Sequence, residues 1–550
     1  MNAKFRVAAL SLALIVLAGL VLLLVRPSLN PARIRPMPLL IGAWLAFIAA
    51  AWLLRKVPRR VCVAAILLGG IAVQLVAVSA PSQNSTDLYR YVWDGRVQAA
   101  GIDPYEYVPA ASQLTGLRDQ GQDFLWRADA HYCVTPSYLR SHPAADLAAG
   151  CTAINRPIYP TIYPPVAEAY FLGVHYLPSG DDSTTPIQAT TAFVAVLTTV
   201  LLLFGLGRLG RDIRMAALWS WCPTVALEAG NSAHVDVVAV AITAAAVLAL
   251  ATARTTRRTI LGGILLGLAI ATKLTPALTV PALLARGDNL PKPPRTGMRR
   301  RWLTVSIAAG SAFVAVYIPH VLAVGGKVIG FLPGYLQQEG YTGGTRFGII
   351  GLFVTGPLAT AVAALILGAV AFAVLQFGDP NRPWEGAVYM TAAALAVATP
   401  SYQWYSLLLV MLVALDGRPE WLAFAAGGYY AAEPSIGRYT VPYRLHDAVA
   451  YGVPVLVVAA GWIVRRALAR RGLGITGLTG SAPVLASPAV TVTAELAVPA
   501  LAVPALATPA LATPALAEAR PVIGAGVSDD SFDAFSPRPV PAGEPRNVWV

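Results

Sequence analysis

One carboxylate stands where it could carry out proton transfer. Residues 85–96 read STDLYRYVWDGR and directly follow an apolar run. A carboxylate there lies between lipid and water, so it can meet a polar acceptor from solvent and a reactive headgroup whose tail stays in the bilayer. Asp87 is therefore the candidate general base. Since Asp is also a preferred N-cap, capping of the following helix is an equally weighted alternative. For Arg90, pairing with Asp94 is the alternative to binding a substrate.

Further polar side chains could bind an anion. His234 and Asp236 share one predicted turn, Lys273 lies at a second, and Arg346 precedes an apolar run. Arg can hold a phosphate through two parallel hydrogen bonds. A His234 that is hydrogen-bonded and orients a phosphate or a sugar is a simpler interpretation than a metal site, because two ligands do not make a metal site. We therefore expect no metal. The alternatives are a salt bridge or snorkelling for Lys273 and membrane anchoring for Arg346.

Aromatic residues crowd the segment 89–126 and recur at 402–405. Tyr89 could stack on a sugar face, and Gln403 could donate hydrogen bonds to one. For most of these aromatic residues an interfacial belt is the alternative that we favour.

The composition places these residues in a membrane protein. Charged residues are 13% of the 550, against about 25% in a soluble domain, while hydrophobic residues are 56% and mean hydropathy is +0.60. A soluble globular fold is therefore excluded. The formal charge of +13 fits basic loops held at the cytoplasmic face, so it does not indicate a nucleic-acid partner.

Apolar runs at 8–25, 38–54 and 61–79 have roughly the length that crosses a ~30 Å hydrocarbon core. Basic residues before the first run and between the second and third place those segments in the cytoplasm, so the chain emerges outside near residue 80. The predicted fold is an all-α, polytopic transmembrane helix bundle of about fourteen helices. The later predicted helices are 187–206, 215–228, 233–252, 259–271, 275–285, 302–320, 347–377, 386–399, 404–415, 420–432 and 447–464, with a partial helix at 160–177.

Residues 80–159 form a polar first loop far longer than the usual loop of about 4 to 6 residues, which favours a functional role. We expect it to contain short helices. On the predicted topology the loop is extracytoplasmic, so Cys133 and Cys151 should form a disulfide, with independent thiols as the alternative. Asp87, His234 and Lys273 fall on the same extracytoplasmic face, and charged side chains gathered at membrane depth indicate a functional site.

After residue 471 the composition becomes rich in Ala and Pro. Frequent prolines forbid a long helix, so residues 472–550 are predicted to be a disordered cytoplasmic tail. The alternative is a spacer that docks a partner. The rest divides into two extra N-terminal helices in 1–60 and a membrane domain in 61–465.

Several motifs resemble a known family. They are DLYRYVWDGRVQAAGIDPY at 87–105, IYPPVA at 162–167, AGNSAHVD at 229–236, TKLTP at 272–276 and GFLPGYLQQEGY at 330–341. Together they resemble polytopic glycosyltransferases of the GT-C superfamily. The nearest likeness is to actinobacterial α-1,6-mannosyltransferases of lipomannan synthesis, which use polyprenol-phosphate-mannose, with family 87-like mannosyltransferases as relatives. The resemblance covers roughly residues 60–465.

The resemblance implies a mannosyltransferase of the cell membrane that works at the extracytoplasmic face without a cofactor. Its donor would be a sugar on a polyprenyl phosphate and its acceptor a glycolipid or polysaccharide of the cell envelope. Asp87 occupies the position of the base, and the reaction would invert the anomeric centre. Lys273, His234 and Arg346 are the candidates for stabilising the departing phosphate. The alternatives are a transporter or flippase of a lipid-linked glycan, and a transferase of another sugar such as arabinofuranose.

Overall fold

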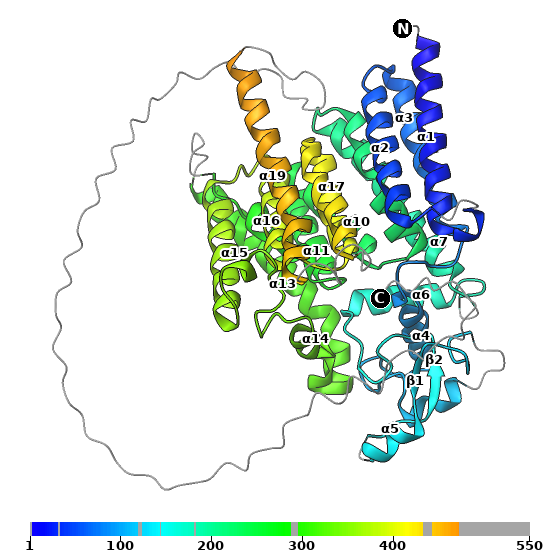
Figure 1. Ribbon diagram of the computed structural model, residues 1–550. Helices are drawn as coiled ribbons and strands as arrows, with labels where there is room; N and C mark the ends of the chain where they lie inside the picture. Colours follow the sequence, from blue (N-terminus) through cyan, green and yellow to red (C-terminus); the bar gives the residue numbers. More distant parts are fainter. Residues whose placement is uncertain are drawn as a thin grey trace, which may run out of the picture. The chain divides into compact units, whose positions relative to one another are not determined.

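The computed structural model describes residues 3–30, 34–118, 124–143, 145–180, 183–287, 295–432 and 443–471 (Figure 1). The predicted tail, 472–550, lies outside the described residues, as does most of the predicted loop at 433–446. The elements up to residue 175 are α1 (Ala3–Val25), η1 (Pro27–Leu29), α2 (Pro36–Leu54), α3 (Arg59–Val78), α4 (Asp87–Ala99), η2 (Ser112–Leu117), β1 (Tyr132–Val134), α5 (Pro136–Ser141), β2 (Gly150–Thr152) and α6 (Pro165–His175).

The remaining elements are almost entirely helical. They are α7 (Thr185–Arg208), η3 (Ile213–Ala216), α8 (Ala217–Ser220), α9 (Pro223–Val225), the π-helical turn η4 (Ala226–Asn231), α10 (Asp236–Ala251), α11 (Thr256–Ile270), η5 (Thr275–Thr279), α12 (Val280–Leu283), α13 (Arg295–Val324), η6 (Gly325–Ile329), α14 (Leu332–Gln338), η7 (Ile350–Leu352), α15 (Pro357–Phe377), α16 (Pro383–Ala398), η8 (Gln403–Ser406), α17 (Leu407–Asp416), η9 (Pro419–Leu422), α18 (Ala423–Ala432) and α19 (Tyr443–Arg470).

Seven helical segments in the described part of the chain are long and apolar enough to cross a membrane. They are Lys4–Val25, Pro36–Leu54, Arg59–Val78, Thr185–Arg208, Arg300–Gln338, Pro357–Phe377 and Leu445–Arg470. Large apolar side chains on these segments are exposed, including Leu12, Leu68 and Leu322. Such a surface is suited to lipid rather than water, so the predicted all-α polytopic membrane bundle is confirmed.

The predicted number of about fourteen spanning helices is reduced to these seven within the described ranges, because several predicted helices are short or broken. Residues 215–228 form η3, α8, α9 and the start of η4 instead of one helix. Pro223 begins α9 and lacks the N–H that would continue α8. The helix predicted at 347–377 begins only at Pro357, after Gly356 at a φ of 67°.

The first loop has its own small core. Helix α4 packs against α6, with the ring of Tyr91 stacked on Phe171 at 4.5 Å between centroids. Strands β1 and β2 pair antiparallel with Cys133 opposite Cys151, and these cysteines form a disulfide. The loop therefore contains a two-stranded sheet in addition to the expected short helices. The disulfide stabilises a segment that has few apolar residues of its own.

Two short elements lie entirely in the interior of the bundle. Helix α17 is buried at every one of its positions, and so is η4. At the start of α14 the chain approaches the first loop closely, where a Cβ on Gly330 would lie 1.9 Å from the Thr161 carbonyl oxygen. Gly330 also has a φ of 58°, a conformation that glycine adopts without strain.

Candidate active site

Asp87 is the first residue of α4, and its carboxylate is tied to the end of the first loop. The side chain is 19% exposed. Its Oδ1 accepts a hydrogen bond of 2.7 Å from the Asn155 amide, while its backbone N–H donates to Ser85 Oγ at 3.1 Å. The N-cap position is held by Thr86, so the alternative of Asp87 as the N-cap does not describe the structure. A partly exposed carboxylate with one oxygen held by an amide is suited to accept a proton.

The other oxygen of Asp87 faces a histidine. His234 Nδ1 lies 3.8 Å from Asp87 Oδ2, and His234 Nε2 lies 3.4 Å from Glu228 Oε2. The imidazole stacks on Trp404 with ring centroids 3.9 Å apart and is completely buried. A ring enclosed in this way has no surface from which to contact a phosphate. The expectation that His234 binds the donor phosphate therefore lacks support in this geometry.

Lys273 is partly neutralised by a carboxylate. Its Nζ lies 3.1 Å from Asp236 Oδ2 and 5.1 Å from the centre of the Tyr163 ring. The Lys273 side chain is 19% exposed, so it retains access to solvent. Burial raises the pKa of Tyr91 and Tyr163 well above the usual value, and the negative charges of Asp87 and Asp236 raise it further. The two phenols thus stay neutral and can donate protons in hydrogen bonds.

A second cluster centres on Glu339, which follows α14. Its Oε1 accepts a hydrogen bond of 2.8 Å from the Tyr402 hydroxyl and lies 3.4 Å from Arg156 Nη2. Its Oε2 accepts a hydrogen bond of 3.1 Å from Arg346 Nη1. Two guanidinium groups therefore share one carboxylate. Such a pair is able to bind a further anion.

Arg156 lies near both Asp87 and Glu339, and the charges of both carboxylates act on its guanidinium group. Burial opposes its charge, but the nearby Tyr402, Asp87 and Glu339 raise the pKa of Arg156 above its usual value, so it stays cationic. Its side chain is 39% exposed, against 5% for Arg346. Arg156 also has a φ of 49°, which is uncommon for a residue with a Cβ and typical of functional sites.

Aromatic stacking joins the clusters. Tyr402 stacks on Trp404 at 4.7 Å, and Trp404 stacks in turn on His234. Arg346 is thereby connected to His234, and through it to Asp87, by a series of contacts that runs through Glu339, Tyr402 and Trp404. Gln403 is buried in η8, where its backbone lies against Gly428 of α18.

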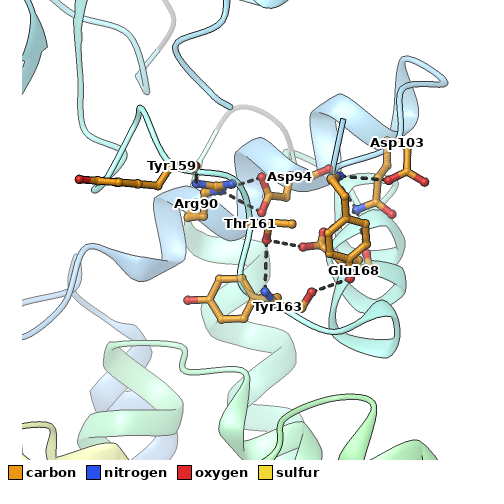
Figure 2. Close-up of polar contacts among 9 residues, drawn as sticks. Arg90, Asp94, Asp103, Tyr159, Thr161, Tyr163 and Glu168 are labelled. Atoms are coloured by element: carbon orange, nitrogen blue, oxygen red, sulfur yellow. Dashed lines mark hydrogen bonds and ion pairs between the residues drawn. The ribbon is translucent and has the colours of Figure 1, made fainter. Parts of the chain in front are cut away.

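Arg90 is bound to a carboxylate, as Figure 2 shows. Its Nε donates to both oxygens of Asp94, at 2.8 and 3.0 Å, and its Nη1 donates to the Tyr159 carbonyl at 3.1 Å. This geometry favours the structural alternative for Arg90 over substrate binding. Tyr89 packs on Phe124 with ring centroids 6.2 Å apart, which is a contact within the first loop.

Asp94, the partner of Arg90, lies near a second buried carboxyl group, that of Glu168 (Figure 2). Asp94 and Glu168 are both buried, and Glu168 Oε1 accepts a hydrogen bond of 2.7 Å from Thr161. Burial, and then the charge of Asp94, raise the pKa of Glu168 well above its usual value, so Glu168 holds a proton when Asp94 is charged. The pair fixes α4, and hence Asp87, against α6.

Four residues that contact the candidate site residues or one another were not predicted from the sequence. They are Asn155, Arg156, Glu228 and Glu339. Glu228 lies one residue before the motif at 229–236, and Glu339 lies inside the motif at 330–341. A carboxylate within an apolar segment is costly unless it is paired, so Glu228 could have been found by that rule. Nothing in the pattern around Asn155 and Arg156 distinguishes them from other loop residues.

Part of the chain matches a known protein family. Residues 161–400 match the model of Glycosyltransferase family 87. In sequence, no curated protein matches the chain. The chain is thus similar to family 87 glycosyltransferases over residues 161–400, and its described part contains seven candidate membrane spans.

The chain also has some structural similarity to the oligosaccharyltransferase of Archaeoglobus fulgidus. The apo form gives a TM-score of 0.33 at 13% identity over 75% of this chain and 56% of that chain. The form tethered to an acceptor peptide gives 0.31 at 12% identity over 76% and 56%. The chain thus spans a little over half the length of these solved structures.

Proposed function

We propose that this protein transfers a mannosyl residue from polyprenyl-phosphate-mannose to a lipid-anchored glycan of the cell envelope, at the extracytoplasmic face of the membrane. Asp87 acts as the general base and the anomeric centre is inverted. The partners are the lipid-linked donor, a glycolipid or polysaccharide acceptor, and the bilayer. The observation that carries the proposal is the position of Asp87, partly exposed and held by Asn155 within a chain of the family 87 type.

Placement at a membrane boundary suits a lipid-linked donor. Asp87 starts α4 nine residues after Val78, where the candidate span Arg59–Val78 ends. A headgroup presented there meets the carboxylate while its polyprenyl chain stays beside the exposed apolar faces of the spans. The acceptor approaches from the water, loses its hydroxyl proton to Asp87 and attacks the anomeric carbon.

Partly exposed cations are available to stabilise the negative charge of the departing phosphate. In inverting transfer the bond between the anomeric carbon and the phosphate oxygen breaks, and the leaving phosphate gains negative charge. Arg156 and Lys273 are both partly exposed, whereas Arg346 lies deeper against Glu339. Fixed cations at the position of developing charge lower the barrier. Arg156 thus joins Lys273 and Arg346 as a phosphate-binding residue, in place of His234.

The test measures transfer of labelled mannose from polyprenyl-phosphate-mannose in membranes that contain the protein. Asp87→Asn should lower kcat by about 100-fold or more, since a general base contributes about 10²- to 10⁴-fold. The matched control is Asp129→Asn, the same substitution at an exposed position of the same loop. Wild-type transfer by a folded Asp87→Asn protein would remove Asp87 as the base.

The competing functions are separated by the same preparation. A flippase would move the labelled lipid across proteoliposome membranes without making a glycosidic bond. A transferase of another sugar would be active with polyprenyl-phosphate-arabinofuranose and inactive with the mannose donor. Analysis of the envelope glycans of a deletion strain identifies the acceptor, because the truncated glycan ends where the missing sugar would be added.

A further inference from the structure

His234 and Glu228 form a buried pair directly behind the proposed base. Both side chains are completely buried. Their atoms lie in a row: Asp87 Oδ2, then His234 Nδ1 at 3.8 Å, then His234 Nε2 across the ring, then Glu228 Oε2 at 3.4 Å. The other oxygen of Glu228 accepts a hydrogen bond of 2.6 Å from the Tyr429 hydroxyl.

The backbone is shaped to hold this row. Glu228 belongs to the π-helical turn η4, a rare element that occurs frequently at functional sites. The backbone N–H of His234 donates to the Glu228 carbonyl at 2.9 Å, and Ala233 before it has a φ of 54°. Trp404 covers one face of the imidazole. The two side chains are therefore fixed relative to each other as well as to Asp87.

Electrostatics limits the charge states of the row. A fully buried carboxylate is costly unless it is paired or hydrogen-bonded, and the groups that face Glu228 are the Tyr429 hydroxyl and His234 Nε2. A neutral His234 with its proton on Nε2 directs that proton at Glu228 and its Nδ1 lone pair at Asp87. Such a tautomer is ready to accept a proton from Asp87.

We propose that His234 and Glu228 form a proton relay for Asp87, an inference that rests on the proposed function. As the acceptor oxygen bonds to the anomeric carbon, its proton moves to Asp87 Oδ2, and the departing phosphate keeps the electron pair of the broken bond. The proton then passes from Asp87 Oδ2 to His234 Nδ1 as the 3.8 Å between these two atoms shortens to hydrogen-bond distance. The resulting imidazolium is balanced by Glu228. His234 and Glu228 act through Asp87 and are positioning residues.

Several titratable groups face the relay from the elements packed around it. Asp87 approaches from α4, Glu228 from η4 and Tyr429 from α18. Asp236, two residues after His234 in the chain, is paired with Lys273. Arg156 is the further cation near Asp87. Of these groups, only Glu228 faces Nε2 of His234 within the described residues.

The test is the pH dependence of kcat for Glu228→Gln. The relay works only when His234 Nδ1 carries no proton, and Glu228 is the carboxylate that faces the opposite ring nitrogen. Removing its negative charge should move the acid limb of the pH–rate profile to lower pH by about one unit or more. The plateau should fall by about tenfold, because the imidazolium formed during the reaction loses its counter-charge. Glu228→Asp should restore much of both, and His234→Gln should abolish the shifted limb.

Glu420→Gln is the matched control, since it makes the same change at a carboxylate that is 13% exposed and pairs with Arg465, away from His234. It should leave the acid limb in place. A uniform loss of rate in Glu228→Gln with an unchanged limb would overturn the relay and leave Glu228 a structural role. An unchanged rate and limb would overturn it as well.

A second measurement separates failure of the relay from failure of the proposed function. The chain has only six histidines, so labelling of histidine side chains gives few NMR signals. The signal missing from His234→Gln identifies His234. In the wild-type protein this ring should become charged at a pH about one unit higher than in Glu228→Gln, whichever substrate the enzyme uses. Identical titration in both proteins contradicts the relay even where no transfer is detected.

Discussion

Asn155 holds Asp87 across the whole first loop: its amide donates a hydrogen bond of 2.7 Å to Asp87 Oδ1, and the two residues are 68 positions apart in the chain. The hydrogen bond fixes one carboxylate oxygen, which leaves the other directed at His234. The residues between them form the disulfide-bonded sheet and α5. The fold of this loop therefore sets the orientation of the proposed base.

Asn155→Ala should lower kcat more than it changes KM, because the amide orients the base without taking part in the chemistry. A hydrogen bond to a charged group contributes about 1.5 to 3 kcal/mol, so the expected loss is about 10- to 100-fold. Initial rates of mannosyl transfer give both constants. Thr135→Ala is the control, since it removes the side-chain cap of α5 in the same loop. Equal rates in Asn155→Ala and the control would show that the hydrogen bond does not position the base.

Arg156→Gln should weaken binding of the donor. Arg156 and Arg346 both contact Glu339, and Arg156 is the more exposed of the two, so its loss removes the guanidinium group that a phosphate could reach. We expect the KM for the donor to rise by about tenfold or more, with partial recovery in Arg156→Lys, which keeps the charge but not the planar fork. Arg140→Gln, at an exposed position of α5, is the matched control. A donor KM equal to that of the control would exclude Arg156 from the phosphate site.

Glu168 should make the fold less stable as pH rises. Burial and the charge of Asp94 raise the pKa of Glu168 well above its usual value of 4.5. Between those two pKa values the folded protein holds a proton that the unfolded chain releases, so stability falls with increasing pH by up to about 1.4 kcal/mol per unit. Glu168→Gln is permanently neutral and lacks this dependence.

The measurement is thermal unfolding of purified protein in detergent between about pH 5 and pH 9. The variant should gain stability relative to the wild-type protein with each step in pH. Asp129→Asn, which alters an exposed carboxylate, should follow the wild-type curve. A constant difference between Glu168→Gln and the wild-type protein across this range would mean that Glu168 is already ionised in the fold.

The sequence predicted the membrane bundle because long apolar runs have few alternatives in lipid. It made Asp87 a candidate base because a carboxylate right after such a run lies between lipid and water, and the resemblance to GT-C glycosyltransferases implied the same role. It did not predict the breaks at Pro223 and Gly356, since composition alone does not show where a buried helix loses its backbone hydrogen bonds. Helices buried inside the bundle, such as α17, need no spanning length, and their apolar runs resemble spans.

The polar partners were harder to predict than the base. Asn155 and Glu339 become functional candidates only through contacts at long sequence separation, with Asp87 at 68 positions and with Arg156 at 183 positions. His234 was assigned to the phosphate because a histidine in a predicted turn was expected to be accessible. In the structure it is enclosed by Trp404 and two carboxylates, an arrangement that depends on the packing of η8 against η4 and α4.

The orientation of the first loop is the remaining prediction, and the chain offers a clean way to measure it. Two of the four cysteines form a disulfide and the other two, Cys62 and Cys222, are buried. A single cysteine introduced at an exposed position should therefore dominate labelling by a maleimide that does not cross membranes. Asp129→Cys places the probe in the first loop, where it should react on intact cells.

Arg257→Cys is the matched probe for the opposite face, because Arg257 is exposed in a basic segment that we predict to be cytoplasmic. It should react only after the cells are made permeable. If position 129 were labelled only in permeable cells and position 257 in intact ones, Asp87 would face the cytoplasm. A headgroup presented outside could not then reach it, so transfer at the extracytoplasmic face would be excluded whatever the outcome of the substitutions at the site.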